Sequence, residues 1–316
     1  MAGFLRGKLG VLRGVDRAII SAERLIGLAM AGCSLITWNI QSCRGCDGVV
    51  DPARIVRACR DMADADVLCF QEVARNFPDL AGSRGEDQFA LLAAQLHGYQ
   101  LVEGIAVDVR APDGSRRQFG NALFSRRPVL QAFRHLLPFP ADAEVPGMQR
   151  VAVEVVVQAP WGPLRVTTTH LAYYSATQRA AQVERLRGLQ AEAAGHERDL
   201  VHRHKEGGPF ATLPRPGSGI LTADFNFRPD DPLYVRLQAP IGAGVPAYRD
   251  SWPIANLGTP HAPTLGVYDK AQWPGDAFCC DFIFVTDDLA PRVDEVVVND
   301  ATDASDHQPV LLRLRI

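Results

Sequence analysis

The chain has 316 residues, of which 47% are hydrophobic and 22% are charged. This is the composition of a soluble globular protein, long enough for one large α/β domain or two smaller ones. The net charge of −3 excludes a general positive field that draws the whole chain to nucleic acid or anionic membranes, but not a local basic cleft. Seven scattered cysteines indicate a reducing compartment rather than a disulfide framework.

Residues 1–32 form a basic N-terminal extension. Ile19, Leu25 and Ile26 recur at helical spacing, which predicts an amphipathic helix. Ala31-Gly32-Cys33 resembles a lipoprotein cleavage site, but the preceding apolar run is short and a core strand follows at once. We therefore expect a cytoplasmic protein whose extension lies on the surface or precedes a true start at Met30. Lipoprotein export or association with a membrane surface is the alternative.

Residues 33–316 are interpreted as one domain, in which apolar, β-branched runs predict strands and periodic segments predict helices. The predicted strands are Ser34–Trp38, Val67–Phe70, Ala122–Phe124, Val151–Val157, Leu164–Thr169, Gly219–Thr222, Phe282–Val285 and Pro309–Arg315. A helix is predicted to begin at Asp51-Pro52, and others over Glu86–Leu96 and Ala176–Glu192. Asp108–Gln118 and Gly195–Gly219 are predicted loops. Because strands alternate with helices but include a hairpin, we expect mixed sheets in an α/β fold.

Polar residues follow or precede these strands at their ends, where α/β folds place binding residues. Four strands are followed by such residues, and the last strand is preceded by three: Asn39, Gln71-Glu72, His170, Asp224 with Asn226, and Ser305-Asp306-His307. Carboxylate oxygens are suited to Mg²⁺ that bridges protein and phosphate, and amide and imidazole groups can hold phosphoryl oxygens. One histidine with a carboxylate behind it can deprotonate a water molecule. A serine or cysteine nucleophile motif, a glycine-rich phosphate loop and a dizinc histidine cluster are not found.

The order of these motifs resembles the endonuclease/exonuclease/phosphatase superfamily, with its deoxyribonuclease I-like fold, over residues 34–316. The resemblance rests on Trp38-Asn39, Phe70-Gln71-Glu72-Val73, Gly120-Asn121-Ala122-Leu123, Thr169-His170-Leu171, Ala223-Asp224-Phe225-Asn226, Asp281-Phe282-Ile283-Phe284-Val285 and Ser305-Asp306-His307. It implies a four-layer sandwich, in which two mixed sheets pack face to face with helices outside and an active site at one end. It also implies that residues 33–316 are a catalytic domain in which water attacks phosphorus with help from one or two divalent ions.

The resemblance also implies roles for individual residues. Glu72 is the expected principal ligand of Mg²⁺, or of Mn²⁺ in its place, with Asn39 beside it and Asp306 completing this or an alternative metal site. His307 is the expected general base, oriented by Asp281.

For the substrate, the resemblance makes His170 and Asn226 the groups that hold the phosphate, while Asn121 supports the phosphate pocket. Asp224 occupies the position of a carboxylate that orients the nucleophile or assists the leaving group.

Two departures from relatives bear on the branch of the superfamily. Gln41 stands where abasic-site repair endonucleases carry an acid, which argues against that activity. Cys279-Cys280 precede Asp281, where relatives often have a basic and then an aliphatic residue. Arg116 and Arg117, on the loop before Asn121, are candidates to replace the missing basic contact, with plain surface positions as the alternative.

The favoured function is a phosphoesterase that hydrolyses phosphate mono- or diesters, and we expect it to be a monomer. Its expected substrate is a nucleic acid, a nucleotide, or a phospholipid or inositol head group. A nuclease of the deoxyribonuclease I type is one alternative, for which the stacking aromatics are few: Tyr173, Tyr174, Trp252, Tyr268 and Trp273. A non-catalytic binding module on the same fold is the other alternative, and it normally lacks the base or a metal carboxylate, both of which are present here.

Overall fold

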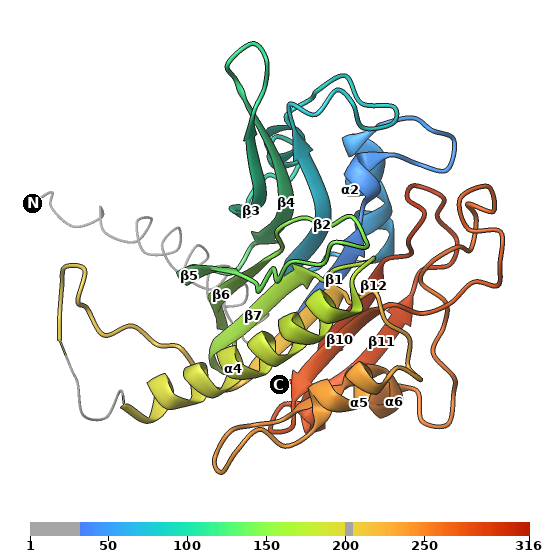
Figure 1. Cartoon of the computed structure of the whole chain (residues 1–316). Coiled ribbons are helices and arrows are strands. Elements are labelled where there is room, and N and C mark those ends of the chain that lie inside the picture. The colour runs from blue at the N-terminus through green and yellow to red at the C-terminus, as the bar shows by residue number, and fades with distance from the viewer. Residues whose placement is uncertain (1–31, 200–204) are drawn as a thin grey trace, which may run out of the picture.

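The computed structural model describes residues 32–199 and 205–316, so the predicted N-terminal helix lies outside the described residues. Two sheets of six strands pack against each other, and helices cover their outer faces (Figure 1). The predicted α/β sandwich is therefore confirmed.

The first sheet has the strand order β11-β12-β1-β2-β4-β3. Its strands are β1 Cys33–Asn39, β2 Val67–Arg75, β3 Gln100–Arg110, β4 Arg116–Ser125, β11 Val293–Val298 and β12 Val310–Leu314. β1 and β2 run parallel, and the other neighbours in this sheet are antiparallel. The carboxyl ends of β1 and β2 therefore meet at one end of the sheet.

The second sheet has the order β5-β6-β7-β8-β10-β9 and repeats this arrangement. Its strands are β5 Val129–Leu136, β6 Val151–Ala159, β7 Gly162–His170, β8 Gly219–Asp224, β9 Tyr248–Asp250 and β10 Asp281–Thr286. Its parallel pair is β7 and β8, and β10 runs antiparallel to β8. Both sheets are mixed, as the hairpin in the sequence predicts.

The helices are α2 Pro52–Met62, α3 Gln88–Ala93, α4 Ala176–Asp199, α5 Pro232–Gln238 and α6 Ser251–Ala255, with short 3₁₀ turns η1 Gln41–Cys43 and η2 Ala290–Arg292. α2 begins as predicted, because the Asp51 side chain accepts hydrogen bonds from the backbone N–H groups of Ala53 and Arg54. None of the described helices is both long and apolar enough to span a membrane.

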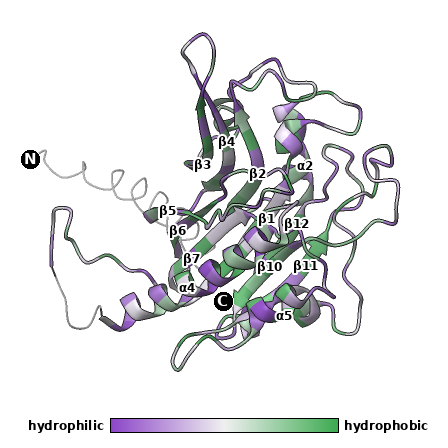
Figure 2. Ribbon diagram, in the orientation of Figure 1, coloured by the Kyte–Doolittle hydropathy of each residue, from purple (hydrophilic) through white to green (hydrophobic). Residues whose placement is uncertain are grey.

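Apolar side chains fill three layers. Alternate residues of the strands, such as Val67 and Cys69 in the first sheet and Val153 and Val155 in the second, pack between the sheets. The opposite face of the first sheet packs on α2 and α3, and that of the second sheet packs on α4 and α5. Apolar colour accordingly concentrates on the strands, while α4 alternates between apolar and polar turns (Figure 2). The closely packed sheets fix the strand ends that carry the functional residues.

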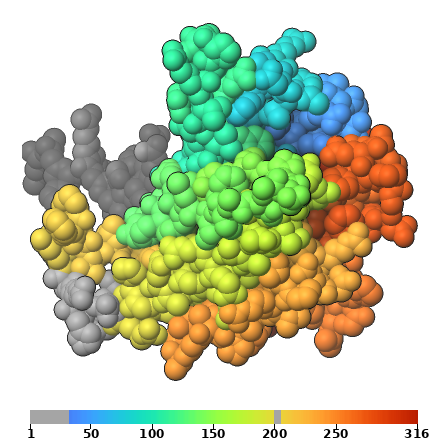
Figure 3. Space-filling model, viewed as in Figure 1, coloured from blue at the N-terminus to red at the C-terminus, as the bar shows by residue number. Residues whose placement is uncertain are grey.

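The structure corrects several predicted boundaries. The predicted loop Asp108–Gln118 is mostly strand, because β3 and β4 extend to a short turn and form the hairpin that projects in Figure 3. β3, β5, β9 and β11 were not predicted; β3, β5 and β11 are half-exposed along much of their length, and exposed residues interrupt their apolar pattern. The predicted helix Glu86–Leu96 is shorter, and α4 continues to Asp199 into the predicted loop Gly195–Gly219.

A buried ion cluster supports the middle of the second sheet. The Glu154 carboxylate on β6 is fully buried and accepts hydrogen bonds from Arg215 Nε at 2.7 Å and Nη2 at 3.2 Å. Arg165 Nη1 lies 3.8 Å from the same carboxylate. Burial by itself raises the pKa of Glu154, but contacts with His135, Arg215 and Arg165 outweigh it and lower the pKa to about 2.

We expect Glu154→Gln to lower the free energy of unfolding at pH 7 by about 3–5 kcal/mol, since the buried Arg165 and Arg215 then lose this carboxylate and Arg215 keeps only the more distant one of Glu192, at 4.0 Å. Because the folded pKa lies below the unfolded one, the stabilisation from Glu154 is present above about pH 4.5 and is lost as the pH falls toward 2. Urea denaturation between pH 3 and 7 measures both effects. Glu295→Gln breaks an exposed pair with Arg313 and serves as the control, with an expected cost below about 1 kcal/mol. Equal costs for the two variants would contradict the assignment.

Candidate active site

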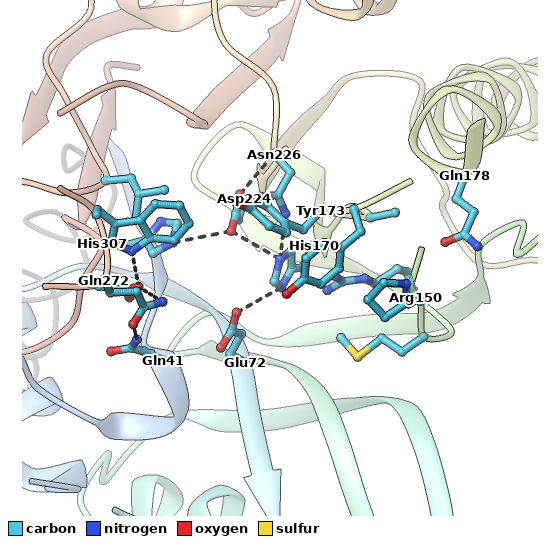
Figure 4. A pocket seen from close by; sticks show the side chains of 18 residues that line it. Gln41, Glu72, Arg150, His170, Tyr173, Gln178, Asp224, Asn226, Gln272 and His307 are labelled. Atoms are coloured by element: carbon cyan, nitrogen blue, oxygen red, sulfur yellow. Dashed lines mark hydrogen bonds and ion pairs between the residues drawn. The ribbon is translucent and has the colours of Figure 1, made fainter. Parts of the chain in front are cut away.

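The predicted strand-end residues gather around one cavity of about 580 Å³, at the end where the carboxyl ends of both parallel pairs meet. Six of the predicted site residues line it: Glu72, His170, Asp224, Asn226, Asp306 and His307. Figure 4 shows Glu72 rising from the first sheet toward His170 and Asp224 of the second. Asn39 and Asp281 lie directly behind this lining and contact it by hydrogen bonds. The residues that the motifs single out are thus brought together from both sheets.

Glu72 is aimed into the cavity by an irregularity in β2. The pairing of β2 with β4 shifts register between Phe70 and Val73, and Glu72 adopts a φ of 60°. A bulge of this kind re-aims a side chain, and a positive φ in a residue other than glycine is strained. The surrounding strands hold this conformation, since Phe70 and Val73 on either side are fully buried.

The Asn39 amide links carboxylates of the two sheets. Its nitrogen donates to Glu72 Oε1 at 3.1 Å and to Asp224 Oδ2 at 3.0 Å. Its oxygen accepts from the backbone N–H of Gln41 at 3.1 Å, which fixes the orientation of the amide. Asn39 therefore presents its nitrogen to Glu72 and holds that carboxylate in place.

Asp306 and His307 lie in the segment before β12, which is pinned to β1. Ser305 Oγ donates to the carbonyl of Asn39 at 2.8 Å, and Trp38 Nε1 donates to the carbonyl of His307 at 2.9 Å. Asp306 Oδ2 accepts a hydrogen bond from Trp273 Nε1 at 3.0 Å. These bonds place the Asp306 carboxylate on the wall of the cavity that also carries Glu72.

His307 and Asp281 form a buried dyad. His307 Nδ1 lies 2.9 Å from Asp281 Oδ2, which also accepts a hydrogen bond from Thr264 Oγ1 at 2.6 Å. Burial lowers the pKa of His307, but the charges of Asp281, Asp224 and Asp306 outweigh burial and raise that pKa well above its usual value. With Nδ1 bonded to Asp281, Nε2 faces the cavity and is the nitrogen that can exchange a proton with a bound molecule.

The pKa of His170 is shifted in the opposite direction to that of His307. Its Nε2 lies 2.9 Å from the side-chain nitrogen of Asn226, which also donates to the Leu171 carbonyl. Nε2 therefore accepts, and the ring proton resides on Nδ1, which has no hydrogen-bond partner among the described residues and lies 3.8 Å from Glu72 Oε1. Burial and then the charges of Arg150 and His307 lower the pKa of His170 well below its usual value. A neutral ring with a free Nδ1–H is suited to donate to a phosphoryl oxygen.

Asp224 lies between the two histidines. Its Oδ2 is 3.3 Å from His170 Nε2 and 3.7 Å from His307 Nε2. Burial, opposed by the charge of His307 and reinforced by that of Asp281, raises the pKa of this carboxyl. Asp224 is therefore placed to contact both a group held by His170 and a water molecule beside His307 (Figure 4).

Arg150, at the start of β6, is a site residue that the sequence analysis missed. It lines the cavity, it is 8% exposed, and its Nε and Nη1 atoms lack hydrogen-bond partners among the described residues. Burial lowers the pKa of its guanidinium, while Glu72 and Asp224 act in the opposite direction. A buried cation with free donors is suited to bind an anion. A lone arginine directly before the buried run Val151–Val157 was the signal available in the sequence.

Other predicted site residues lie outside the cavity lining. The Asn121 amide donates to the Val151 carbonyl at 2.9 Å, so Asn121 contacts the start of β6 next to Arg150. Arg116 pairs with Asp108 and Arg117 with Asp79 on the projecting hairpin, and neither arginine lines the cavity. Both arginines are therefore paired on the hairpin, outside the cavity lining.

Among the predicted aromatic residues, Tyr173, Tyr174 and Trp273 line the cavity. Trp252 instead stacks on His261, and the Tyr268 hydroxyl donates to the Asp300 carbonyl.

The possible ligand atoms in the cavity indicate which metal ion it suits. Glu72 and Asp306 offer hard carboxylate oxygens, and the pKa of Glu72 is raised by desolvation and by the charge of Asp306, an unfavourable arrangement that a divalent cation would relieve. The sulfur, carboxylate and imidazole of Cys280, Asp281 and His307 form a second group within 4.8 Å. Burial raises the pKa of the Cys280 thiol well above its usual value, so this thiol stays protonated beside Asp281. The oxygen ligands therefore fit Mg²⁺ or Mn²⁺ best.

We expect nitrogen NMR of the protein, recorded with a chelator and without added divalent ions, to distinguish the two histidines. His170 should appear as the neutral Nδ1–H tautomer at pH 6, and His307 as the doubly protonated ring. His170→Gln and His307→Gln assign the signals. A charged His170 at pH 6 would contradict the hydrogen bonding described for Asn226.

Comparison with known proteins agrees with this geometry. The sequence model of the endonuclease/exonuclease/phosphatase family matches residues 36–307. The crystal structure of an endonuclease/exonuclease/phosphatase from Beutenbergia cavernae DSM 12333 is 25% identical in sequence. Its TM-score is 0.57, and the match covers 90% of this chain and 72% of that one.

Two further structures show the same fold at lower identity. A mannosyl-6-phosphatase from Bacteroides thetaiotaomicron is 17% identical, with a TM-score of 0.59 over 90% of this chain and 100% of that one. TDP2 from D. rerio, complexed with a single-strand DNA product, is 20% identical, with a TM-score of 0.56 over 90% and 99%. No curated protein sequence matches the chain. The match across most of its length shows that the chain belongs to the endonuclease/exonuclease/phosphatase family.

Proposed function

We propose that the chain is a Mg²⁺-dependent phosphoesterase, which hydrolyses phosphate mono- or diesters by attack of a water molecule activated by His307. Members of its family are hydrolases that act on phosphoester bonds. One observation carries the proposal. The His307–Asp281 dyad and the donors of His170 and Arg150, which have no hydrogen-bond partners among the described residues, line or adjoin the same cavity. A base on one side and anion-binding donors on the other are the two parts that hydrolysis of a phosphate ester needs.

The residues divide the work by position. His170 Nδ1–H and the Arg150 guanidinium donate to phosphoryl oxygens, on which negative charge increases during the reaction. His307 Nε2 takes the proton of the attacking water, and Asp281 stabilises the imidazolium that forms. Asp224, 3.7 Å from His307 Nε2, orients the same water. Asn226 holds His170 in its Nδ1–H tautomer through the bond to Nε2.

Glu72 and Asp306 would hold the cation, with Asn39 fixing the Glu72 carboxylate. When bound, Mg²⁺ supplies charge neutralisation of the phosphate and offsets the carboxylates that raise the pKa of His307. The presence of both these carboxylates and of the dyad argues against a non-catalytic binding module.

We expect Glu72→Gln to remain folded and to lose activity on phosphate esters by about a thousandfold or more, because a neutral amide is a poor ligand for Mg²⁺. Initial rates with Mg²⁺ titrated from zero to excess measure the loss and any change in metal dependence. Glu295→Gln breaks an exposed ion pair with Arg313 outside the cavity lining, so it serves as the control and should keep the wild-type rate. If folded Glu72→Gln protein turned over substrate at the wild-type rate, the assignment of Glu72 as a metal ligand would be wrong.

We expect His307→Ala to abolish turnover and Asp281→Asn to reduce it less. Activity needs neutral His307, so the rate falls as the pH drops below the pKa of this ring. Asp281→Asn removes a charge that raises that pKa, so the acidic limb of the pH–rate profile should move to lower pH while the plateau falls. Profiles of kcat/KM from pH 5 to 9 measure both effects. An unchanged acidic limb in a still-active His307→Ala variant would show that another group is the base.

A further inference from the structure

The cavity continues beyond the catalytic groups into a compartment next to Arg150. Tyr173, Tyr174, Gln178 and the segment 146–148 line this part. Figure 4 shows Gln178 at the start of α4, on the side of Arg150 that faces away from His307. None of the proposed chemical steps uses Gln178 or the two tyrosines, so this compartment is available to a part of the substrate other than its phosphate.

Gln178 carries an unsatisfied acceptor. The side chain is 2% exposed, and its Nε2 donates to the Pro140 carbonyl at 3.0 Å. Since a carbonyl can only accept, this bond fixes which end of the amide is nitrogen. The other end, Oε1, has no hydrogen-bond partner among the described residues. A buried acceptor without a partner is costly, and a ligand that brings an N–H or O–H donor removes that cost.

Gly147 lies close against this amide. A Cβ at Gly147 would lie 3.0 Å from Gln178 Oε1 and 3.1 Å from a ring carbon of Phe139. Any larger side chain would therefore press on the amide oxygen that faces the compartment.

Exposed aromatic rings form the side of the compartment near solvent. Tyr173 and Tyr174 are 44% and 61% exposed, and their rings meet edge to face with centroids 4.7 Å apart. Tyr173 also packs edge to face on Trp273, at 6.0 Å. Rings held by such contacts, with a face still accessible, offer a flat surface on which another ring can stack.

Charge around the cavity favours a compact substrate. Arg150 is the only arginine or lysine among the described residues that line it, whereas Glu72, Asp224 and Asp306 are acidic. Duplex DNA needs several basic side chains along its phosphate backbones. Arg116 and Arg117, on the projecting hairpin, are paired with aspartates. The charge of the cavity therefore suits a substrate with one phosphate group better than a long polyanion.

We propose that Tyr174 and Gln178 form a subsite for the ring of a small phosphate ester, with the ring stacked on Tyr174 and an N–H or O–H at its edge donating to Gln178 Oε1. The inference rests on the proposed function and names its substrate class. A nucleoside phosphate and a hexose phosphate share this chemistry: each has a ring face that packs on an aromatic ring, the π face of a base or the C–H face of a pyranose, and N–H or O–H donors at the ring edge.

The test measures kcat/KM with Mg²⁺ for adenosine 5′-phosphate, glucose 6-phosphate and ring-free glycerol 3-phosphate, each as the monoester and as its methyl diester. We expect the wild type to prefer at least one ring-bearing ester over the glycerol ester by about tenfold or more. Gln178→Met and Tyr174→Ala should each remove about tenfold from that ester through KM, and leave glycerol phosphate unchanged. A preference for the adenosine ester identifies a nucleoside phosphate as the substrate, and a preference for the glucose ester identifies a hexose phosphate.

Gln158→Met is the control. Gln158 lies near the end of β6, and its Nε2 likewise donates to a backbone carbonyl, that of Ala159, but the residue is exposed and does not line the cavity. The ratio of ring-bearing to ring-free activity should therefore stay at its wild-type value.

Three results would overturn the subsite: no preference for either ring, equal losses on all substrates in the Gln178 and Tyr174 variants, or cleavage of plasmid DNA far more efficient than of every small ester. The proposed function fails separately, when the wild type turns over neither the esters nor DNA in a Mg²⁺-dependent manner.

Discussion

One side-chain amide, that of Asn39, donates hydrogen bonds to carboxylates from both sheets, and the geometry of the cavity depends on this bridge. Glu72 from the first sheet and Asp224 from the second lie 3.1 and 3.0 Å from the same nitrogen. Two carboxylates that face each other in a partly desolvated cavity repel. A shared donor offsets the repulsion without adding a charge, so the cavity remains acidic enough to attract a divalent cation. The bridge itself is held because the Gln41 backbone N–H occupies the amide oxygen.

The sandwich also maintains strained backbone where the functional side chains are attached. Glu72 and Asn226 adopt φ values of 60° and 53°, each a conformation that costs of order 1–3 kcal/mol in a residue other than glycine. The neighbours of both residues are tightly packed, and Phe225, next to Asn226, is fully buried against Phe282 and Phe284. Packing between and outside the sheets therefore stabilises conformations that a short peptide would leave. Rigid positions of this kind keep donors and carboxylates oriented before a ligand binds.

The sequence predicted those parts of the molecule whose signal is local and strong. Continuous apolar runs located the central strands, and the polar residue after each run located Glu72, His170 and Asp224. The edge strands β3, β5 and β11 escaped prediction because exposed residues interrupt their apolar pattern. Arg150 was missed because its significance comes from burial and from an electrostatic interaction with Glu72, a residue 78 positions away, which no periodicity encodes. The tautomer of His170 depends in the same way on a partner brought in by folding.

The two histidines show how one cavity gives the same side chain opposite roles. Both rings are buried and both approach Asp224, so burial and that contact do not distinguish them. The difference is the other neighbour: His307 Nδ1 meets the carboxylate of Asp281, whereas His170 is close to the guanidinium of Arg150. The carboxylate keeps a proton on His307, whereas burial, reinforced by the guanidinium, keeps the second proton off His170. A pair of rings whose pKa values are moved apart in this way gives one strong base and one neutral donor, so in the proposed reaction a phosphate bound between them would have a defined attacking side.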